Sequence, residues 1–127
     1  MSKISISRVQ EAFNSAIKKR DRICRVRDFS PCCGILECSH YFGVGAYPSL
    51  RFHPKNAYAQ CTAHHRAHHN GKKFYTEWIE EKPDYERLSR LKNSYIRYTE
   101  ELKAQIIKLC NSGRLDELAE LIEKEMR

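Results

Sequence analysis

Residues 38–69 read CSHYFGVGAYPSLRFHPKNAYAQCTAHHRAHH and contain the pattern that decides the fold. Six side chains in this stretch follow one another in the order that is informative: His40, Asn56, Cys61, His64, His65 and His69. If residues 61–69 form a helix, His65 and His69 lie one turn apart and both imidazoles can bind one ion. Cys61 and His64 form a separate pair on another side of that turn. Because the two pairs differ in softness, the segment predicts two different metal sites.

One predicted site is a structural zinc site, in which Cys61 and His64 supply half of a tetrahedron. Upstream thiols supply the other half: Cys33 is expected as the third ligand and Cys24 as the fourth, with Cys32 and Cys38 as alternatives. Bound zinc would compensate for a small core, because coordination couples directly to the free energy of folding. The chain has six cysteines, and at least two of them are expected to be small buried apolar residues.

The other predicted site is catalytic, because a helix with His65 and His69 opposite a strand with His40 is the arrangement of a ββα nuclease. In such a site a divalent ion binds the scissile phosphate, and a histidine that is not a metal ligand removes a proton from the attacking water. His40 is the expected base, since an imidazole with a pKa of about 6.5 is largely neutral at cytoplasmic pH. Asn56 is expected to tie the intervening loop to the backbone near His40 and so orient the imidazole.

The length and the charge of the chain limit the classes of partner and the cellular compartment that we expect. A chain of 127 residues predicts one functional unit, and 23 Lys and Arg against 16 Asp and Glu give a net charge of +7 that favours a polyanionic partner such as DNA. No stretch approaches the about 18 consecutive apolar residues that span a membrane, and the N-terminus lacks the apolar run of a signal peptide. We therefore expect a cytoplasmic protein without a membrane partner, whose cysteines bind metal instead of forming disulfides.

The flanking segments predict mostly helices. Apolar residues at three- and four-residue spacing indicate an amphipathic helix over residues 5–22 that ends in a basic run. In residues 28–54, prolines and glycines interrupt short apolar pieces such as GILECSHYF and YPSLRF, which predicts a hairpin with irregular loops. Short helices are expected over residues 61–70 and 72–82, and a proline stops the second.

The rest of the chain is expected to be helical. Apolar residues recur at three- and four-residue intervals from residue 84 to 110, which predicts one long amphipathic helix, and a last helix, LDELAELIEKEM, is predicted to fold back on it. Residues 1–83 therefore group as a basic helix plus nuclease core, and residues 84–127 as a helical extension of the same unit. The heptad-like spacing from Leu88 to Leu102 permits a homodimer seam as well as intramolecular packing.

The order of these residues resembles that of the HNH, or ββα-metal, nucleases. That superfamily has a base histidine, a later asparagine, and a helix reading C-x-x-C-H followed by another metal ligand. The matching residues of this chain are His40, Asn56, Cys61-Thr62-Ala63-His64-His65 and His69. Within the superfamily, residues 38–79 are similar to the NinG, or Rap, family of phage recombination nucleases, and the similarity extends over residues 20–95. The resemblance implies branched DNA as substrate and a phage or prophage gene expressed in bacterial cytoplasm.

Three positions depart from the family pattern. His64 stands where the family usually has a second cysteine, and zinc accepts imidazole equally well. The upstream Cys-x-x-Cys pair is disturbed, since Cys24 has no second thiol three residues later. Ser39 precedes the base where many HNH nucleases have an Asp or His metal ligand. The replacement is expected among Glu37, His68 and water, or else the ion is held by His65, His69 and phosphate oxygens alone.

Together these observations predict an α+β fold with a basic N-terminal helix, a zinc-stapled ββα-metal core and a helical C-terminal half. The predicted function is hydrolysis of DNA phosphodiester bonds with a structural Zn²⁺ and a catalytic Mg²⁺, Mn²⁺ or Zn²⁺. Phosphate contacts are expected from nearby cations: Arg51, Lys55, Arg66, Lys72 and Lys73. A non-catalytic zinc-dependent DNA-binding module is the alternative, and Ser39 favours it. A helical adaptor that docks on a recombination or replication protein through residues 84–127 is compatible with either.

Overall fold

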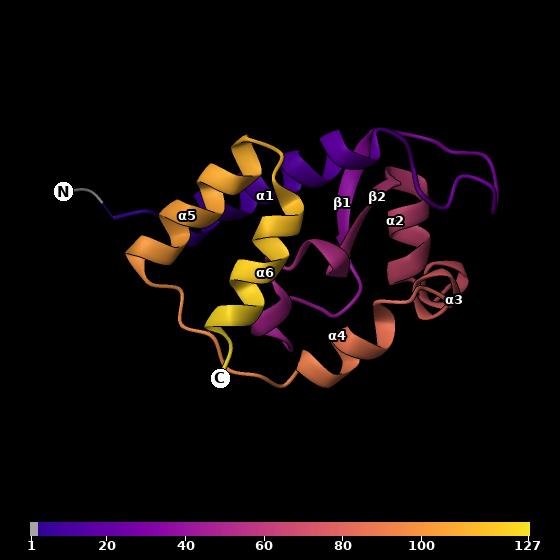
Figure 1. Cartoon of the computed structure of the whole chain (residues 1–127). Helices are drawn as coiled ribbons and strands as arrows, with labels where there is room; N and C mark the ends of the chain where they lie inside the picture. Colours follow the sequence, from indigo (N-terminus) through magenta and orange to yellow (C-terminus); the bar gives the residue numbers. More distant parts are fainter. Residues whose placement is uncertain (1–2) are drawn as a thin grey trace.

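A two-stranded sheet with helices packed on both sides forms the centre of the molecule (Figure 1). The computed structural model describes residues 3–127. The elements follow in the order α1 (Ile6–Asp21), β1 (Leu36–His40), η1 (Pro48–Leu50), η2 (Pro54–Asn56), β2 (Ala57–Cys61), α2 (Thr62–His69), α3 (Phe74–Glu80), α4 (Tyr85–Leu91), α5 (Glu100–Asn111) and α6 (Leu115–Glu125). The α+β class that the sequence predicts is confirmed.

The sheet joins two segments of the chain that a long loop separates. β1 and β2 are antiparallel, with His40 at the end of β1 opposite Ala57 at the start of β2. β2 leads directly into α2, so the order is strand, strand, helix. The hairpin predicted within residues 28–54 is wrong in its second strand, because YPSLRF contains the η1 turn instead. Pro48 has no backbone N–H for a strand ladder, and its fixed φ suits the first position of a helical turn.

Helix α1 confirms the helix predicted over residues 5–22. Ser5 caps it by accepting a hydrogen bond from the backbone N–H of Arg8. The apolar stripe of α1 belongs to the main core and consists of Val9, Phe13, Ala16 and Ile17. Asp21 ends the helix, and its Oδ2 accepts a hydrogen bond of 2.8 Å from the backbone N–H of Ala59. This bond ties the end of α1 to the middle of β2.

Helices α2 and α3 confirm the short helices predicted over residues 61–70 and 72–82. A second apolar cluster joins them to the sheet and contains Cys24, Val26, Tyr58, Cys61, Phe74, Tyr75 and Ile79. The Tyr75 hydroxyl donates a hydrogen bond of 2.8 Å to the Ser39 carbonyl, which fastens α3 to β1. The sheet thus has α1 on one side and α2 with α3 on the other (Figure 1).

The single long helix predicted over residues 84–110 is wrong, because a non-helical segment separates α4 from α5. Thr99 caps α5 by accepting a hydrogen bond from the backbone N–H of Leu102, and a capping residue has extended rather than helical backbone angles. Within the same segment, Tyr95 exchanges two backbone hydrogen bonds, each of 2.8 Å, with Arg127. Arg127 therefore forms hydrogen bonds with the backbone N–H and C=O of Tyr95, which would bond within the helix if the helix were continuous.

The break also interrupts the heptad-like spacing from Leu88 to Leu102, on which the homodimer seam permitted by the sequence is based. Leu88 lies on α4 and Leu102 on α5, and only 1% and 3% of their surfaces are exposed. Both leucine side chains are therefore buried by contacts within their own chain. The main core is shared by α1, α5 and α6, since Val9, Ile106 and Leu118 belong to one cluster.

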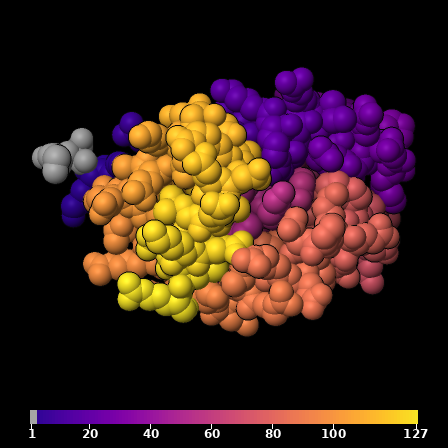
Figure 2. Space-filling model, viewed as in Figure 1, coloured from indigo at the N-terminus to yellow at the C-terminus, as the bar shows by residue number. Residues whose placement is uncertain are grey.

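Helix α6 confirms the last predicted helix and folds back against α5. Gly113 makes the turn with a φ of 69°, a conformation that favours glycine. Glu123 on α6 accepts hydrogen bonds from Arg87 of α4 and from Nε2 of His53, just before η2. The space-filling view shows α6 (yellow) lying between α5 and α4 (Figure 2). Among residues 3–127, no helix is long and apolar enough to cross a membrane.

Candidate functional site

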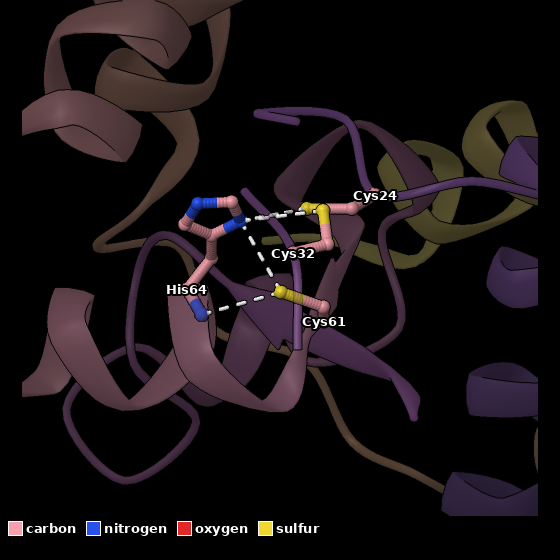
Figure 3. Close-up of side chains that lie close together, drawn as sticks. All are labelled: Cys24, Cys32, Cys61 and His64. Carbon is pink, nitrogen blue, oxygen red and sulfur yellow. Dashed lines mark hydrogen bonds between the residues drawn. The ribbon is translucent and has the colours of Figure 1, made fainter. Parts of the chain in front are cut away.

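Four side chains from three parts of the chain converge on one point beside α2 (Figure 3). The ligand atoms of Cys24, Cys32, Cys61 and His64 all lie within 4.8 Å of one another. Nδ1 of His64 is 3.2 Å from the sulfur of Cys61, 3.3 Å from that of Cys24 and 3.7 Å from that of Cys32. In a tetrahedral zinc site, bond lengths of about 2.3 Å to sulfur and 2.0 Å to nitrogen give nitrogen–sulfur separations of roughly 3.5 Å. The cluster therefore fits one zinc ion with three thiolates and one imidazole.

Local structure explains how Cys61 and His64 meet. Cys61 ends β2 and caps α2, and its sulfur accepts a hydrogen bond of 3.4 Å from the backbone N–H of His64. The other ring nitrogen of His64, Nε2, lies 2.8 Å from the hydroxyl of Ser30. If Nε2 carries the hydrogen and donates it to Ser30, the lone pair on Nδ1 is available to a metal. Histidine ligands of metals usually have such a hydrogen-bond partner on the other ring nitrogen, and this partner fixes the tautomer.

The two remaining thiols come from residues 22–35, which we call the connecting arm. This segment joins α1 to β1 and contains no helix or strand. The backbone N–H of Arg25 donates to the carbonyl of Ala59 on β2 at 2.9 Å, and the Cys33 carbonyl accepts from the N–H of Ala63 on α2 at 3.1 Å. These bonds hold the arm along the sheet and α2, and they place Cys24 and Cys32 beside His64.

Cys33, the expected third ligand, is replaced by its alternative Cys32. Cys33 is exposed and lies outside the cluster. Its neighbour Gly34 has a φ of 92° and lies against Thr62, so the arm turns sharply where it meets α2. Cys38 packs against the main core and Cys110 is buried within it, and burial raises the pKa of each thiol to about 12. These two are the apolar cysteines that the count of six predicts.

The pKa values of Cys32 and Cys61 are shifted in opposite directions. Cys32 is exposed as a residue, but desolvation of its thiol, followed by hydrogen bonding to Cys61 and Cys24, raises its pKa to about 12. Burial also acts to raise the pKa of Cys61, but the backbone N–H groups of His64 and Cys33 donate to its sulfur and lower the pKa overall. Zinc binds thiolates, so loading the cluster releases protons.

A second group of polar side chains lies on α2 and β1. Nε2 of His65 and Nε2 of His69 are 3.0 Å apart, and Nδ1 of His65 is 2.8 Å from Oε1 of Glu37. Two nitrogens bound at right angles to one ion, at about 2.1 Å each, are also about 3.0 Å apart. Within residues 3–127, however, only the cysteine cluster brings three or more ligand atoms within 4.8 Å of one another. The histidine pair therefore offers two ligands and leaves the other coordination positions open.

His40 is oriented by the backbone of a distant residue. Its Nε2 lies 2.9 Å from the carbonyl oxygen of Arg51, and its ring stacks on Phe13 at a centroid distance of 5.6 Å. Since a carbonyl only accepts, Nε2 carries the hydrogen and Nδ1 keeps its lone pair. Burial lowers the pKa of His40, and the charges of Arg51 and His65 lower it further. His40 is therefore a neutral imidazole near pH 7.

Asn56 ties together the loop that holds His40. It is fully buried, and its Oδ1 accepts a hydrogen bond of 2.8 Å from the backbone N–H of Phe42. Its Nδ2 donates to the carbonyls of Phe42 and Leu50 at 3.0 and 3.1 Å. Leu50 directly precedes Arg51, so Asn56 fixes the carbonyl that orients His40.

The five cations expected at phosphates do not line one common groove. None of Arg51, Lys55, Arg66, Lys72 and Lys73 forms a salt bridge within residues 3–127. Nε of Arg51 donates to Oε1 of Gln10 on α1 at 2.7 Å, and this hydrogen bond orients the Arg51 guanidinium. The backbone carbonyl of the same residue is the group that contacts His40. Lys72 and Lys73 instead line a groove with Phe29 and Trp78.

Ser39 and Gln60 are the least satisfied polar residues of this region. Both are buried, and neither the hydroxyl of Ser39 nor the amide of Gln60 has a hydrogen-bond partner among residues 3–127. Gln60 lies opposite Glu37 in the sheet register. Sequence reasoning missed Gln60, Ser30 and Gln10, because their importance depends on neighbours that are distant in the chain. The polar position of Gln60 within an otherwise apolar strand is the one signal that pointed to it.

Comparison with known proteins identifies the family. The family model described as Bacteriophage Lambda NinG protein matches residues 2–118, which is most of the chain. No curated protein and no solved structure gives a significant match. The match includes the cysteine cluster and the residues around His40. The chain therefore belongs to the NinG family.

Proposed function

We propose that this NinG-family protein is a metal-dependent endonuclease that hydrolyses DNA phosphodiester bonds. The observation that supports the proposal most is the orientation of His40. Its Nε2–H is held by the Arg51 carbonyl, which leaves Nδ1 free to accept a proton. A partly buried imidazole with a lowered pKa, at the end of a strand that also bears Glu37, has the properties of a general base.

In this proposal His65 and His69 hold the catalytic divalent ion, and Glu37 orients His65 by accepting the hydrogen on Nδ1. The ion supplies charge stabilisation for the scissile phosphate and for the leaving 3′ oxygen. Glu37 does not replace the metal ligand missing at Ser39; in this proposal water and phosphate oxygens fill the remaining coordination positions. Imidazole ligands favour Mn²⁺ or Zn²⁺ over Mg²⁺.

Three residues have separate roles in the proposed reaction: His40, Arg51 and Asn56. Nδ1 of His40 removes a proton from water, whose oxygen attacks phosphorus while the bond to the 3′ oxygen breaks. The guanidinium of Arg51, held by Gln10, contacts a phosphate oxygen. Asn56 keeps the loop between β1 and η2 in place, so that His40 keeps its direction.

The cysteine cluster has a structural role in the same proposal. Four protein ligands fill a tetrahedron, so zinc bound there has no open position for substrate. The net charge of +7 supports DNA as the partner, and the family supports a phage recombination function with branched DNA as substrate. The cytoplasm of a bacterial host is the matching compartment.

A second candidate function is a zinc-dependent DNA-binding module without catalysis. Two observations favour it: Ser39 offers no metal ligand with its unpartnered hydroxyl, and the histidine pair is not part of a cluster of three converging ligands. In that case His40, His65 and His69 would contribute only to the packing of the protein and to its surface charge.

The test is cleavage by the zinc-loaded protein of a four-way branched DNA and of a linear duplex. Each substrate is incubated without added metal and with Mg²⁺, Mn²⁺ or Zn²⁺, and binding is measured in parallel by gel shift. Cleavage that requires a supplied divalent ion supports the endonuclease. DNA binding without cleavage under any of these conditions overturns it in favour of the binding module.

A further inference from the structure

A groove on the far side of the cysteine cluster is not used by the proposed cleavage site. It has a volume of about 440 Å³ and lies between the connecting arm and α3. The arm contributes Arg25, Val26, Asp28 and Phe29, and the segment that contains α3 contributes Lys72, Lys73, Phe74, Glu77, Trp78 and Glu81. Neither His40 nor the histidine pair lines it.

Phe29 is the most informative residue of this groove. It is 58% exposed, which is unusual for a phenylalanine. Its ring nevertheless has a fixed place, because it stacks on Phe74 with centroids 4.3 Å apart and planes at 25°. Phe74 in turn packs against the ring of His64 at 5.4 Å, so the cysteine cluster supports the stack. The Phe29 ring is thus supported by Phe74, while more than half of its surface stays exposed where it lines the groove.

The charges around Phe29 complement a nucleotide. Lys72 and Lys73 are exposed and form no salt bridge within residues 3–127. The guanidinium of Arg25 lies 5.9 Å from the Trp78 ring and 3.8 Å from Oδ1 of Asp21, so the two lysines are the cations of the groove without an ion-pair partner among the described residues. These cations suit phosphate oxygens, and the open aromatic face suits a base. The groove also has three carboxylates, which can accept hydrogen bonds from the exocyclic amino groups of adenine and cytosine.

We propose that this groove binds an unpaired nucleotide of single-stranded DNA, with the base stacked on Phe29 and its phosphates near Lys72 and Lys73. Bases inside a duplex are already stacked on their neighbours and do not present a free face, so the groove selects single strands. The surface is separate from the cleavage site and rests on the proposed function only for DNA as the partner.

Trp78 allows a direct test, because it is the only tryptophan of the chain and lines the groove. The zinc-loaded full-length protein, without added divalent ions, is titrated with a ten-nucleotide oligo(dA) while tryptophan fluorescence is recorded. We expect saturable quenching by the single strand and little by a duplex of the same length. Phe29→Ala should weaken binding roughly tenfold, since stacking contributes about 1–3 kcal/mol per base. Lys72→Ala with Lys73→Ala should weaken it further and reduce its salt dependence.

Matched variants distinguish stacking on Phe29 from a loss of fold or of general positive charge. Phe29→Leu keeps the apolar volume but removes the aromatic face, so it should also weaken binding while the zinc content stays unchanged. Tyr95→Ala removes another aromatic residue, 65% exposed and outside the groove, and should bind like wild type, as should Lys108→Ala with Lys124→Ala.

Wild-type affinity in both Phe29 variants, or equal quenching by duplex and single strand, would overturn the proposal. His40→Ala, which tests the cleavage proposal, should bind oligo(dA) like wild type, so the two proposals can fail separately.

Discussion

The cysteine cluster and the histidine pair lie on the same short helix, yet they differ in how they are built. The cluster collects four ligands from the connecting arm, β2 and α2, and three of the four are buried. The pair has two ligands one turn apart, with one carboxylate behind them and the remaining side open. A closed set of four protein ligands is typical of structural zinc, and an open set is typical of catalytic metal. In the proposed function, one side of α2 binds the structural zinc and another side binds the catalytic ion.

The closed site gives the largest expected effect. Cys32→Ser should reduce bound zinc well below one ion per chain and abolish cooperative thermal unfolding, because structural zinc can contribute on the order of 10 kcal/mol to folding. Cys33→Ser is the matched control, since its thiol is adjacent, exposed and outside the cluster. Zinc content is measured by elemental analysis and unfolding by circular dichroism. Loss of zinc in Cys33→Ser, with zinc retained in Cys32→Ser, would contradict the ligand set.

The open site should respond to metal concentration instead of losing its fold. His65→Ala and Glu37→Gln should each raise the Mn²⁺ concentration needed for half-maximal cleavage by about 10- to 100-fold, because one removes a ligand and the other removes its orienting partner. Excess Mn²⁺ should restore much of the rate, and thermal unfolding should stay near that of wild type. Glu86→Gln, an exposed carboxylate on α4, is the control. An unchanged Mn²⁺ requirement in both site variants would show that the ion binds elsewhere.

A smaller effect concerns pH. Burial lowers the pKa of His40 below its usual 6.5, so the imidazole is a competent base above that lowered pKa and is lost as a base when pH falls through it. The ratio of wild-type to His40→Ala cleavage rates should therefore stay constant from pH 8 to 6.5. Only when the pH falls through the lowered pKa of His40 should the ratio decrease, toward tenfold per pH unit. A decrease that begins above pH 7 would mean that His40 is not the group that titrates.

The sequence predicted those parts of the molecule that depend on local spacing. The one-turn separation of His65 and His69 follows from helix geometry, and α1 and α6 follow from apolar periodicity and their end signals. The pairing of Cys61 with His64 is equally local, because a strand that runs into a helix brings these two together.

The parts that the sequence did not predict depend on distant contacts. Cys32 and Cys33 are neighbours of the same type, and only the path of the connecting arm decides which one reaches His64. The break between α4 and α5 depends on Tyr95 pairing with Arg127 at the end of the chain. The stack of Phe29 on Phe74 likewise joins residues far apart in the chain. Periodicity in one segment contains no information about such partners.

The most direct test of the endonuclease is the His40→Ala variant, measured on a branched DNA with saturating Mn²⁺ and compared with wild type for cleavage rate, zinc content and gel-shift affinity. Deleting the proton acceptor should slow cleavage by about 100-fold or more, because general base catalysis contributes at least that much, while zinc content and DNA affinity stay within about twofold of wild type. Cleavage by His40→Ala at the wild-type rate would show that His40 is not the base and would contradict the proposed mechanism.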